Sequence, residues 1–146
     1  DRVLLCVRDW RAFRASLQEM GAGQGALHEA DVDPALWWAR ELVATVEDAL
    51  IRRYPIEIVR FEEVLRRPSA LSESLGWLGP QAAARAAGVV QARPEVDVEV
   101  PPGLSSMAND LNDLSDMLRH GVRPDWALLR RMRALRGRLA SPGSGP

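Results

Sequence analysis

An arginine and a serine, Arg8 and Ser16, are the side chains of this sequence whose types and spacing point most directly to chemistry. Arg8 follows the apolar run Val3–Val7, and Ser16 lies in the amphipathic segment that comes next. The run is typical of a strand in a parallel sheet, and such sheets bind ligands at the carboxyl ends of their strands. A guanidinium there offers forked donors that suit a phosphate group, which a nearby serine hydroxyl could also bind. The alternative is that Arg8 only pairs with Asp9 or another surface acid.

The other reactive side chains have simpler structural interpretations. Cys6 lies in the middle of the apolar run, which predicts a buried, unreactive thiol. His28 lies in a glycine-rich stretch, where it could accept a proton but is more simply a solvent-exposed loop residue. His120 falls at the end of a predicted helix, where the helix dipole favours a positive charge. Glu62 and Glu63 could form an acid/base pair, but adjacent residues point in different directions, which favours structural roles. This set contains no pattern of metal ligands, so no metal site is expected.

Hydrophobic periodicity predicts the elements that would position these side chains. Two strands, near 3–7 and 56–61, are joined by a long helical crossover, which predicts an α/β fold with a parallel sheet. The rest of the chain is predicted to be mostly helical, and Asp33 followed by Pro34 is a strong helix start. We expect helices over 10–20, 34–53, 69–79, 81–90, 104–120 and 125–139, a helical turn over 62–67 and an extended edge segment over 94–102.

Several finer expectations follow from the same patterns. The first strand should be buried on both faces because all five of its residues are apolar. Ser69 should cap the helix that follows it, with Leu71, Leu75 and Leu78 on the buried side of that helix. Trp126 should lie on the apolar stripe of the last helix. A strand so close to Asp1 also predicts that an N-terminal portion is missing, or that its neighbouring strands come from elsewhere.

Composition places the chain among soluble globular domains. With 146 residues, 47% hydrophobic and 27% charged, it fits one domain over residues 1–140 with a flexible tail over 141–146. No apolar run approaches the ~20 residues that span a bilayer, and no signal-peptide pattern is visible, so we expect a cytoplasmic protein without membrane contact. All 19 basic residues are arginine, which excludes lysine chemistry from this stretch of chain.

Charge is distributed unevenly near the C-terminus. Residues 95–116 carry six acids and no arginine, and residues 117–146 carry seven arginines and one acid. The simplest interpretation is two antiparallel helices, one acidic and one basic, that attract each other. A nucleic-acid surface is disfavoured because the chain as a whole, with a net charge of −1, is not basic. A surface for a partner or an anionic substrate is the third interpretation.

Three segments together resemble the second half of the sulfotransferases that use 3′-phosphoadenosine 5′-phosphosulfate (PAPS). The first is the strand with Arg8 and Ser16. The second is the aromatic-rich helix with the sequence Pro-Ala-Leu-Trp-Trp-Ala-Arg-Glu-Leu over 34–42. The third is Ile-Val-Arg-Phe-Glu-Glu-Val-Leu-Arg-Arg-Pro over 58–68, followed by Leu-Gly-Trp-Leu-Gly over 75–79. Their order and spacing agree with the family over residues 3–79, about half of the chain.

The resemblance implies a P-loop-like parallel sheet with flanking helices, and a role for three residues. Arg8 and Ser16 would bind the 3′-phosphate of PAPS or of its product, adenosine 3′,5′-bisphosphate. Phe61 stands where the family usually has a tyrosine that contacts the nucleotide. The family's Arg-Lys-Gly element has no clear equivalent, and Arg93, Arg119 and Arg123 are candidate substitutes. Asp9-Trp10 also replaces the usual Asn-Pro or Asp-Pro. The family's phosphosulfate loop and catalytic base have no counterpart in this sequence.

In this interpretation the complete domain transfers a sulfuryl group from PAPS to a hydroxyl or amine on a small-molecule or glycan acceptor. Residues 21–33 and the helices after Leu104 would shape the acceptor pocket. A homodimer or a complementary N-terminal segment is the expected partner, and no nucleic acid is expected. The alternative is a non-catalytic domain that keeps the sulfotransferase architecture as a scaffold, or a helical protein-interaction domain.

Overall fold

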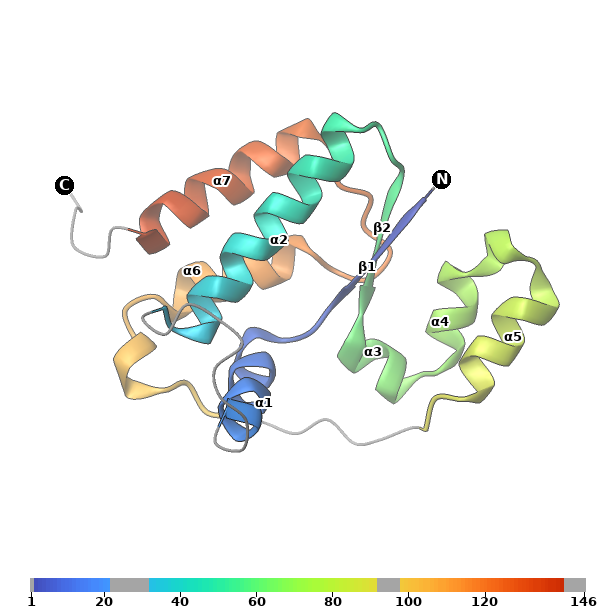
Figure 1. Cartoon of the computed structure of the whole chain (residues 1–146), viewed down its shortest axis with the longest axis horizontal. Coiled ribbons are helices and arrows are strands. Elements are labelled where there is room, and N and C mark those ends of the chain that lie inside the picture. The colour runs from blue at the N-terminus through green and yellow to red at the C-terminus, as the bar shows by residue number, and fades with distance from the viewer. Residues whose placement is uncertain (1, 22–31, 92–97, 141–146) are drawn as a thin grey trace.

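The computed structural model describes residues 2–21, 32–91 and 98–140, which form a mostly helical α/β structure with a small parallel sheet (Figure 1). The two strands are β1 (Val3–Val7) and β2 (Ile56–Arg60). The α-helices are α1 (Trp10–Gly21), α2 (Pro34–Ile51), α3 (Phe61–Arg66), α4 (Ser69–Ser74), α5 (Pro80–Gly88), α6 (Ala108–Met117) and α7 (Trp126–Ala140). Two short 3-10 helices, η1 (Gly76–Leu78) and η2 (Pro102–Leu104), complete the described elements.

The two strands run parallel, as their sequences predict. Their register places Val3 opposite Ile56 and Val7 opposite Arg60, so both strands end at the same edge. The second strand is one residue shorter than expected, because Phe61 already begins α3. Helices α1 and α2 form the crossover between the strands (Figure 1). The chain directions therefore bring the residues after β1 and after β2 together at one end of the sheet.

The far edge of β2 is partly covered by a turn from the C-terminal half of the chain. The Gly121 amide donates to the Ile58 carbonyl oxygen at 2.8 Å, and the Ile58 amide donates to the Val122 carbonyl oxygen at 3.1 Å. Gly121 has a φ of 76°, a conformation that glycine adopts without the steric cost of a Cβ atom. This pair of hydrogen bonds fixes residues just after α6 beside the sheet.

Helix α2 begins as the Asp33-Pro34 pair predicts and forms the centre of the core. The Asp33 carboxylate accepts from the Ala35 amide at 2.9 Å, and Pro34 occupies the first helical position. Helix α2 buries a different set from the predicted Leu36, Trp37, Val43, Val46 and Leu50, because Leu36, Trp37 and Leu50 are only partly buried. Its buried residues are Ala35, Trp38, Ala39, Leu42, Val43, Val46 and Ala49.

Helices α6 and α7 pack with α2 to complete the core, on one side of the sheet (Figure 1). Their apolar stripes follow the predicted helical spacing. The fully buried side chains they contribute include Leu111, Leu114, Leu118, Leu129 and Met132. Charge complementarity also occurs, since Arg138 of α7 pairs with Asp110 of α6 at 2.6 Å and Arg133 of α7 pairs with Glu47 of α2.

Three predictions about α4 and α7 were wrong. Trp126 is 49% exposed because it stands at the first position of α7, beyond the packed part of the stripe. Ser69 is the first residue of α4 and makes no capping hydrogen bond there, since Pro68 occupies the cap position. The predicted helix over 69–79 stops at Ser74, so its periodicity breaks, and Leu78 is exposed. Residues 98–101 form no strand, and the rest of the predicted edge segment lies outside the described residues.

The first strand is less buried than its apolar sequence predicts. Only Val7 is fully buried, and Cys6 is exposed. The reason is that β1 pairs with β2 along one edge, and no other described strand pairs with its opposite edge. The prediction of a buried thiol at Cys6 was therefore wrong. Within the described ranges no helix combines the length and the apolar character needed to cross a membrane.

Candidate anion-binding site

The three residues predicted to bind a nucleotide lie in contact at the carboxyl end of the sheet. Arg8 follows β1, and its Nη1 donates to the Ser16 hydroxyl on the second turn of α1 at 2.7 Å. The Arg8 guanidinium also lies over the Phe61 ring, with 5.4 Å between Cζ and the ring centroid. Phe61 is the first residue of α3, directly after β2. The parallel register thus brings together side chains that are 53 positions apart in the sequence.

Neighbouring contacts hold Arg8 and Ser16 in place. The Trp38 indole of α2 donates to the Arg8 carbonyl oxygen at 3.1 Å, which anchors the end of β1 against α2. Helix α1 is tied to α2 by stacking of Phe13 on Trp37, with ring centroids 5.6 Å apart. These contacts fix the backbone of both anion-binding candidates while leaving the Arg8 guanidinium half-buried.

The alternative interpretation of Arg8, an ion pair with Asp9, does not occur. Asp9 instead caps α1 and pairs with Arg11. Its Oδ1 accepts from the Arg11 amide at 2.8 Å, and its Oδ2 lies 3.2 Å from the Arg11 Nη1. In the described part of the chain, Arg8 contacts a neutral hydroxyl and an aromatic ring and pairs with no carboxylate. No carboxylate among the described residues therefore neutralises its positive charge.

A carboxylate joins the ends of the two strands beside this pair. Glu62 Oε1 accepts from the Asp9 amide at 2.6 Å, and Glu62 Oε2 lies 3.4 Å from the Arg60 Nη2. Glu62 Oε2 is buried and makes no hydrogen bond, so the nearby Arg60 charge mainly offsets the cost of burying this carboxylate oxygen. Glu63 points elsewhere and pairs with Arg67 at 3.2 Å. The two adjacent glutamates thus have different partners, and Glu62 positions the backbone next to Arg8.

Sequence reasoning did not find the polar cluster on the other side of Glu62. Arg60 donates to the Ser115 hydroxyl at 2.7 Å, and its backbone amide donates to His120 Nδ1 at 3.4 Å. His120 therefore lies three residues beyond the end of α6, against β2, rather than at a helix terminus as predicted. These residues line a cavity of about 270 Å³ together with Arg119. The one sequence signal for this cluster was that Arg60 lies within the segment 58–68 of the family resemblance.

The remaining candidates are spread over the molecule. Arg119 is exposed beside the Arg60 cluster, and Arg123 lines a cavity at the opposite, amino end of the sheet. Arg93 and His28 lie outside the described residues. Among the residues with described positions, no group of histidine, cysteine and acidic side chains is arranged to hold a metal ion.

The electrostatics of the sheet edge also reach Cys6, two residues before Arg8. Partial desolvation raises the pKa of the Cys6 thiol although the residue is exposed, and the Glu62 carboxylate raises it further, while Arg60 opposes the shift. A thiol with a raised pKa is a poor nucleophile at neutral pH. The direction of this pKa shift therefore agrees with the predicted low reactivity of Cys6.

Comparisons of the chain with models of protein families, with curated proteins and with solved structures give no match.

Proposed function

We propose that this chain is the 3′-phosphate-binding part of a PAPS-dependent sulfotransferase-like domain with a P-loop-like parallel sheet. The observation that carries the proposal is the contact of Arg8 with both Ser16 and Phe61, without a carboxylate partner for Arg8 in the described residues. A half-buried guanidinium that faces a hydroxyl and a ring suits a phosphate attached to a flat base. The resemblance over residues 3–79 selects the same three residues.

In this proposal Arg8, Ser16 and Phe61 bind the donor, PAPS. Arg8 and Ser16 bind the 3′-phosphate, and Phe61 packs against the nucleotide without the hydroxyl that a tyrosine would offer. The acceptor, a hydroxyl or amine of a small molecule or glycan, attacks the sulfur of PAPS in line. The bond between that sulfur and the phosphate oxygen breaks, and adenosine 3′,5′-bisphosphate leaves. We assign neither a catalytic base nor a metal, and we place the activity in the cytoplasm.

Calorimetric titration with adenosine 3′,5′-bisphosphate tests the proposal. Arg8→Ala should weaken binding by about 10–100-fold, because a charge-assisted contact to phosphate is worth about 1.5–3 kcal/mol. Ser16→Ala should weaken it less than Arg8→Ala, because it removes one hydrogen bond to the phosphate and leaves the Arg8 charge in place. Arg130→Ala is the matched control, since it removes an exposed arginine of α7 far from the site along the chain.

A second ligand separates recognition of the 3′-phosphate from recognition of the nucleotide. Adenosine 5′-phosphate lacks the 3′-phosphate, so Arg8→Ala should leave its affinity nearly unchanged. Equal loss for both ligands would contradict the assigned role of Arg8. Absence of bisphosphate binding by the folded wild-type chain, with folding checked by circular dichroism, would overturn the proposed function.

The alternative is a non-catalytic sulfotransferase-like scaffold or helical protein-interaction domain. The observation that favours it is the exposure of large apolar side chains, since Trp77, Leu78 and Trp126 are each about half exposed. Light scattering after size exclusion distinguishes the two. A strict monomer that binds the bisphosphate favours the nucleotide-binding function, and a stable homodimer without nucleotide affinity favours the scaffold.

A further inference from the structure

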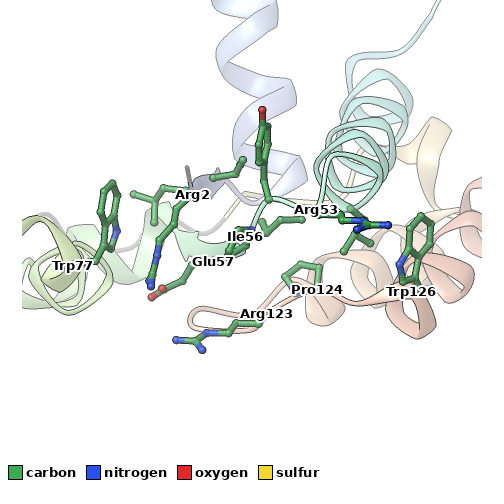
Figure 2. Close-up of a pocket in the computed structure, with 13 residues that line it drawn as sticks. Arg2, Arg53, Ile56, Glu57, Trp77, Arg123, Pro124 and Trp126 are labelled. Atoms are coloured by element: carbon green, nitrogen blue, oxygen red, sulfur yellow. The ribbon is translucent and has the colours of Figure 1, made fainter.

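A second cavity lies at the amino end of the sheet, opposite the end that carries Arg8. It has a volume of about 530 Å³, and Figure 2 shows the side chains that line it. The starts of both strands, the end of α2, η1 and the loop before α7 all contribute to its walls. Its apolar floor includes Val3, Leu50 and Ile56. The cavity is large enough for a few side chains of a bound peptide.

The lining combines exposed tryptophans with arginines. Trp77 and Trp126 are 48% and 49% exposed, whereas large aromatic side chains of a free-standing domain are mostly covered. The Arg2 guanidinium lies over the Trp77 ring at 6.0 Å from its centroid. Figure 2 shows Arg2 and Trp77 at one end of the cavity and Arg53 and Trp126 at the other. An occupant could therefore meet an aromatic face and a cation at both ends.

The charge of the lining is positive. Arg2, Arg53 and Arg123 face a single acid, Glu57, which leaves a formal charge of +2. None of the three arginines forms an ion pair with a carboxylate in the described part of the chain. A ligand that replaces their hydration must bring negative charge.

Arg53 stands at a position where the backbone favours glycine. Helix α2 ends in a Schellman motif, in which the Tyr54 amide donates to the Ala49 carbonyl oxygen at 2.9 Å and the Arg53 amide donates to that of Leu50 at 3.1 Å. This motif requires a left-handed residue, and Arg53 adopts a φ of 58°. It is the only non-glycine residue with positive φ in the described ranges. A guanidinium that pairs with no described acid therefore stands at a backbone position that costs a non-glycine residue energy.

We propose that this cavity docks an acidic peptide segment of a protein partner, with an aromatic or large apolar side chain of that segment between Trp77 and Trp126. Tryptophan, tyrosine and arginine are the residue types that dominate the energy of protein interfaces, and Trp77, Trp126, Tyr54 and the three arginines all line this cavity. A simple anion would contact the arginines but leave both tryptophans in water. The proposal does not rest on nucleotide binding at the other end of the sheet.

The test is selection of peptides on the full chain. A library of random heptapeptides on phage is selected on the wild-type protein, and the enriched peptides are measured by fluorescence anisotropy. We expect enrichment of peptides that combine aspartate or glutamate with an aromatic residue, and tighter binding at low salt. Selection that yields no specific peptides, or peptides without acidic residues, would overturn the proposal.

Two substitutions place the selected peptides in the cavity. Arg53→Gly removes a guanidinium and also relieves the positive φ, so the protein should remain folded while affinity falls about tenfold. Trp77→Ala removes an exposed ring and should weaken binding by a similar factor. Arg52→Ala is the matched control, because Arg52 is adjacent, exposed and outside this cavity, and it should leave the affinity unchanged. Binding that survives both Arg53→Gly and Trp77→Ala would refute the location.

Other occupants give distinct results. If inorganic phosphate displaces the peptides far more effectively than chloride at equal ionic strength, the cavity is an anion site and the proposal fails. If the wild type is a dimer by light scattering and Trp77→Ala is a monomer without added peptide, the occupant is a second copy and the proposal also fails. Adenosine 3′,5′-bisphosphate should not compete with the peptides, so failure here and failure of the proposed function are separable.

Discussion

Replacement of Glu62 is the most informative perturbation of the sheet edge, because one carboxylate joins the ends of both strands. Its Oε1 accepts from the Asp9 amide at 2.6 Å, and its Oε2 lies 3.4 Å from the Arg60 guanidinium. The Glu62 and Arg60 side chains are 17% and 18% exposed, so water cannot easily replace either contact. A backbone amide left without its charged acceptor costs about 1.5–3 kcal/mol.

Glu62→Ala and Glu62→Gln should lower the free energy of unfolding by different amounts. Glu62→Ala removes the acceptor and the ion pair, and we expect the free energy of unfolding to fall by about 3 kcal/mol. Glu62→Gln keeps an amide oxygen for the Asp9 amide and loses only the charge, so the expected fall is about 1 kcal/mol. Arg60 retains its hydrogen bonds to Ser115 in both variants, which limits the loss.

Urea unfolding followed by circular dichroism measures these values. Glu63→Ala is the control, because it removes the neighbouring carboxylate, whose contacts are with Arg66 and Arg67 on the surface. Surface ion pairs of this kind contribute about 0.5 kcal/mol. If Glu62→Ala costs no more than Glu63→Ala, or if the alanine and glutamine variants of Glu62 are equally stable, the assigned role of Glu62 is wrong.

Three further measurements test the core, the helix start and the thiol. Trp10→Ala should destabilise the protein by about 3–5 kcal/mol, because the ring is fully buried and its indole donates to Asn112. A loss below about 2 kcal/mol in urea unfolding would contradict that packing. Asp33→Ala should cost about 1–2 kcal/mol in the same assay through loss of the α2 cap and of the ion pair with Arg14 at 3.0 Å, whereas Asp33→Asn keeps the cap and loses only the ion pair. Cys6 should react with iodoacetamide more slowly than free cysteine at pH 8, because its raised pKa leaves less thiolate. As the pH increases, the reaction rate of Cys6 should level off at a higher pH than that of free cysteine. Glu62→Gln should lower that pKa and speed the reaction, as followed by mass spectrometry; an unchanged rate would refute the influence of Glu62 on the thiol.

The sequence by itself determined the elements whose signals are local. The Asp33-Pro34 start of α2, the parallel strands and the stripes of α6 and α7 follow from capping and from periodicity, which depend on residues a few positions apart. The position of Arg8 at a strand end and the spacing to Ser16 selected these two residues, and the resemblance to the sulfotransferases added Phe61. They meet because the sheet is parallel and in register, so the residues after each strand lie at one edge.

Only the tertiary structure decided the contacts between distant segments. Arg60, Ser115 and His120 form a cluster because the turn after α6 packs on β2, and no local pattern encodes that approach. Exposure of Cys6 and Trp126 likewise depends on which neighbours are present, and an apolar residue type alone does not specify them. The cavity at the amino end of the sheet is assembled from separate parts of the chain, so its charge and its tryptophans became visible as one site only when the fold brought them together.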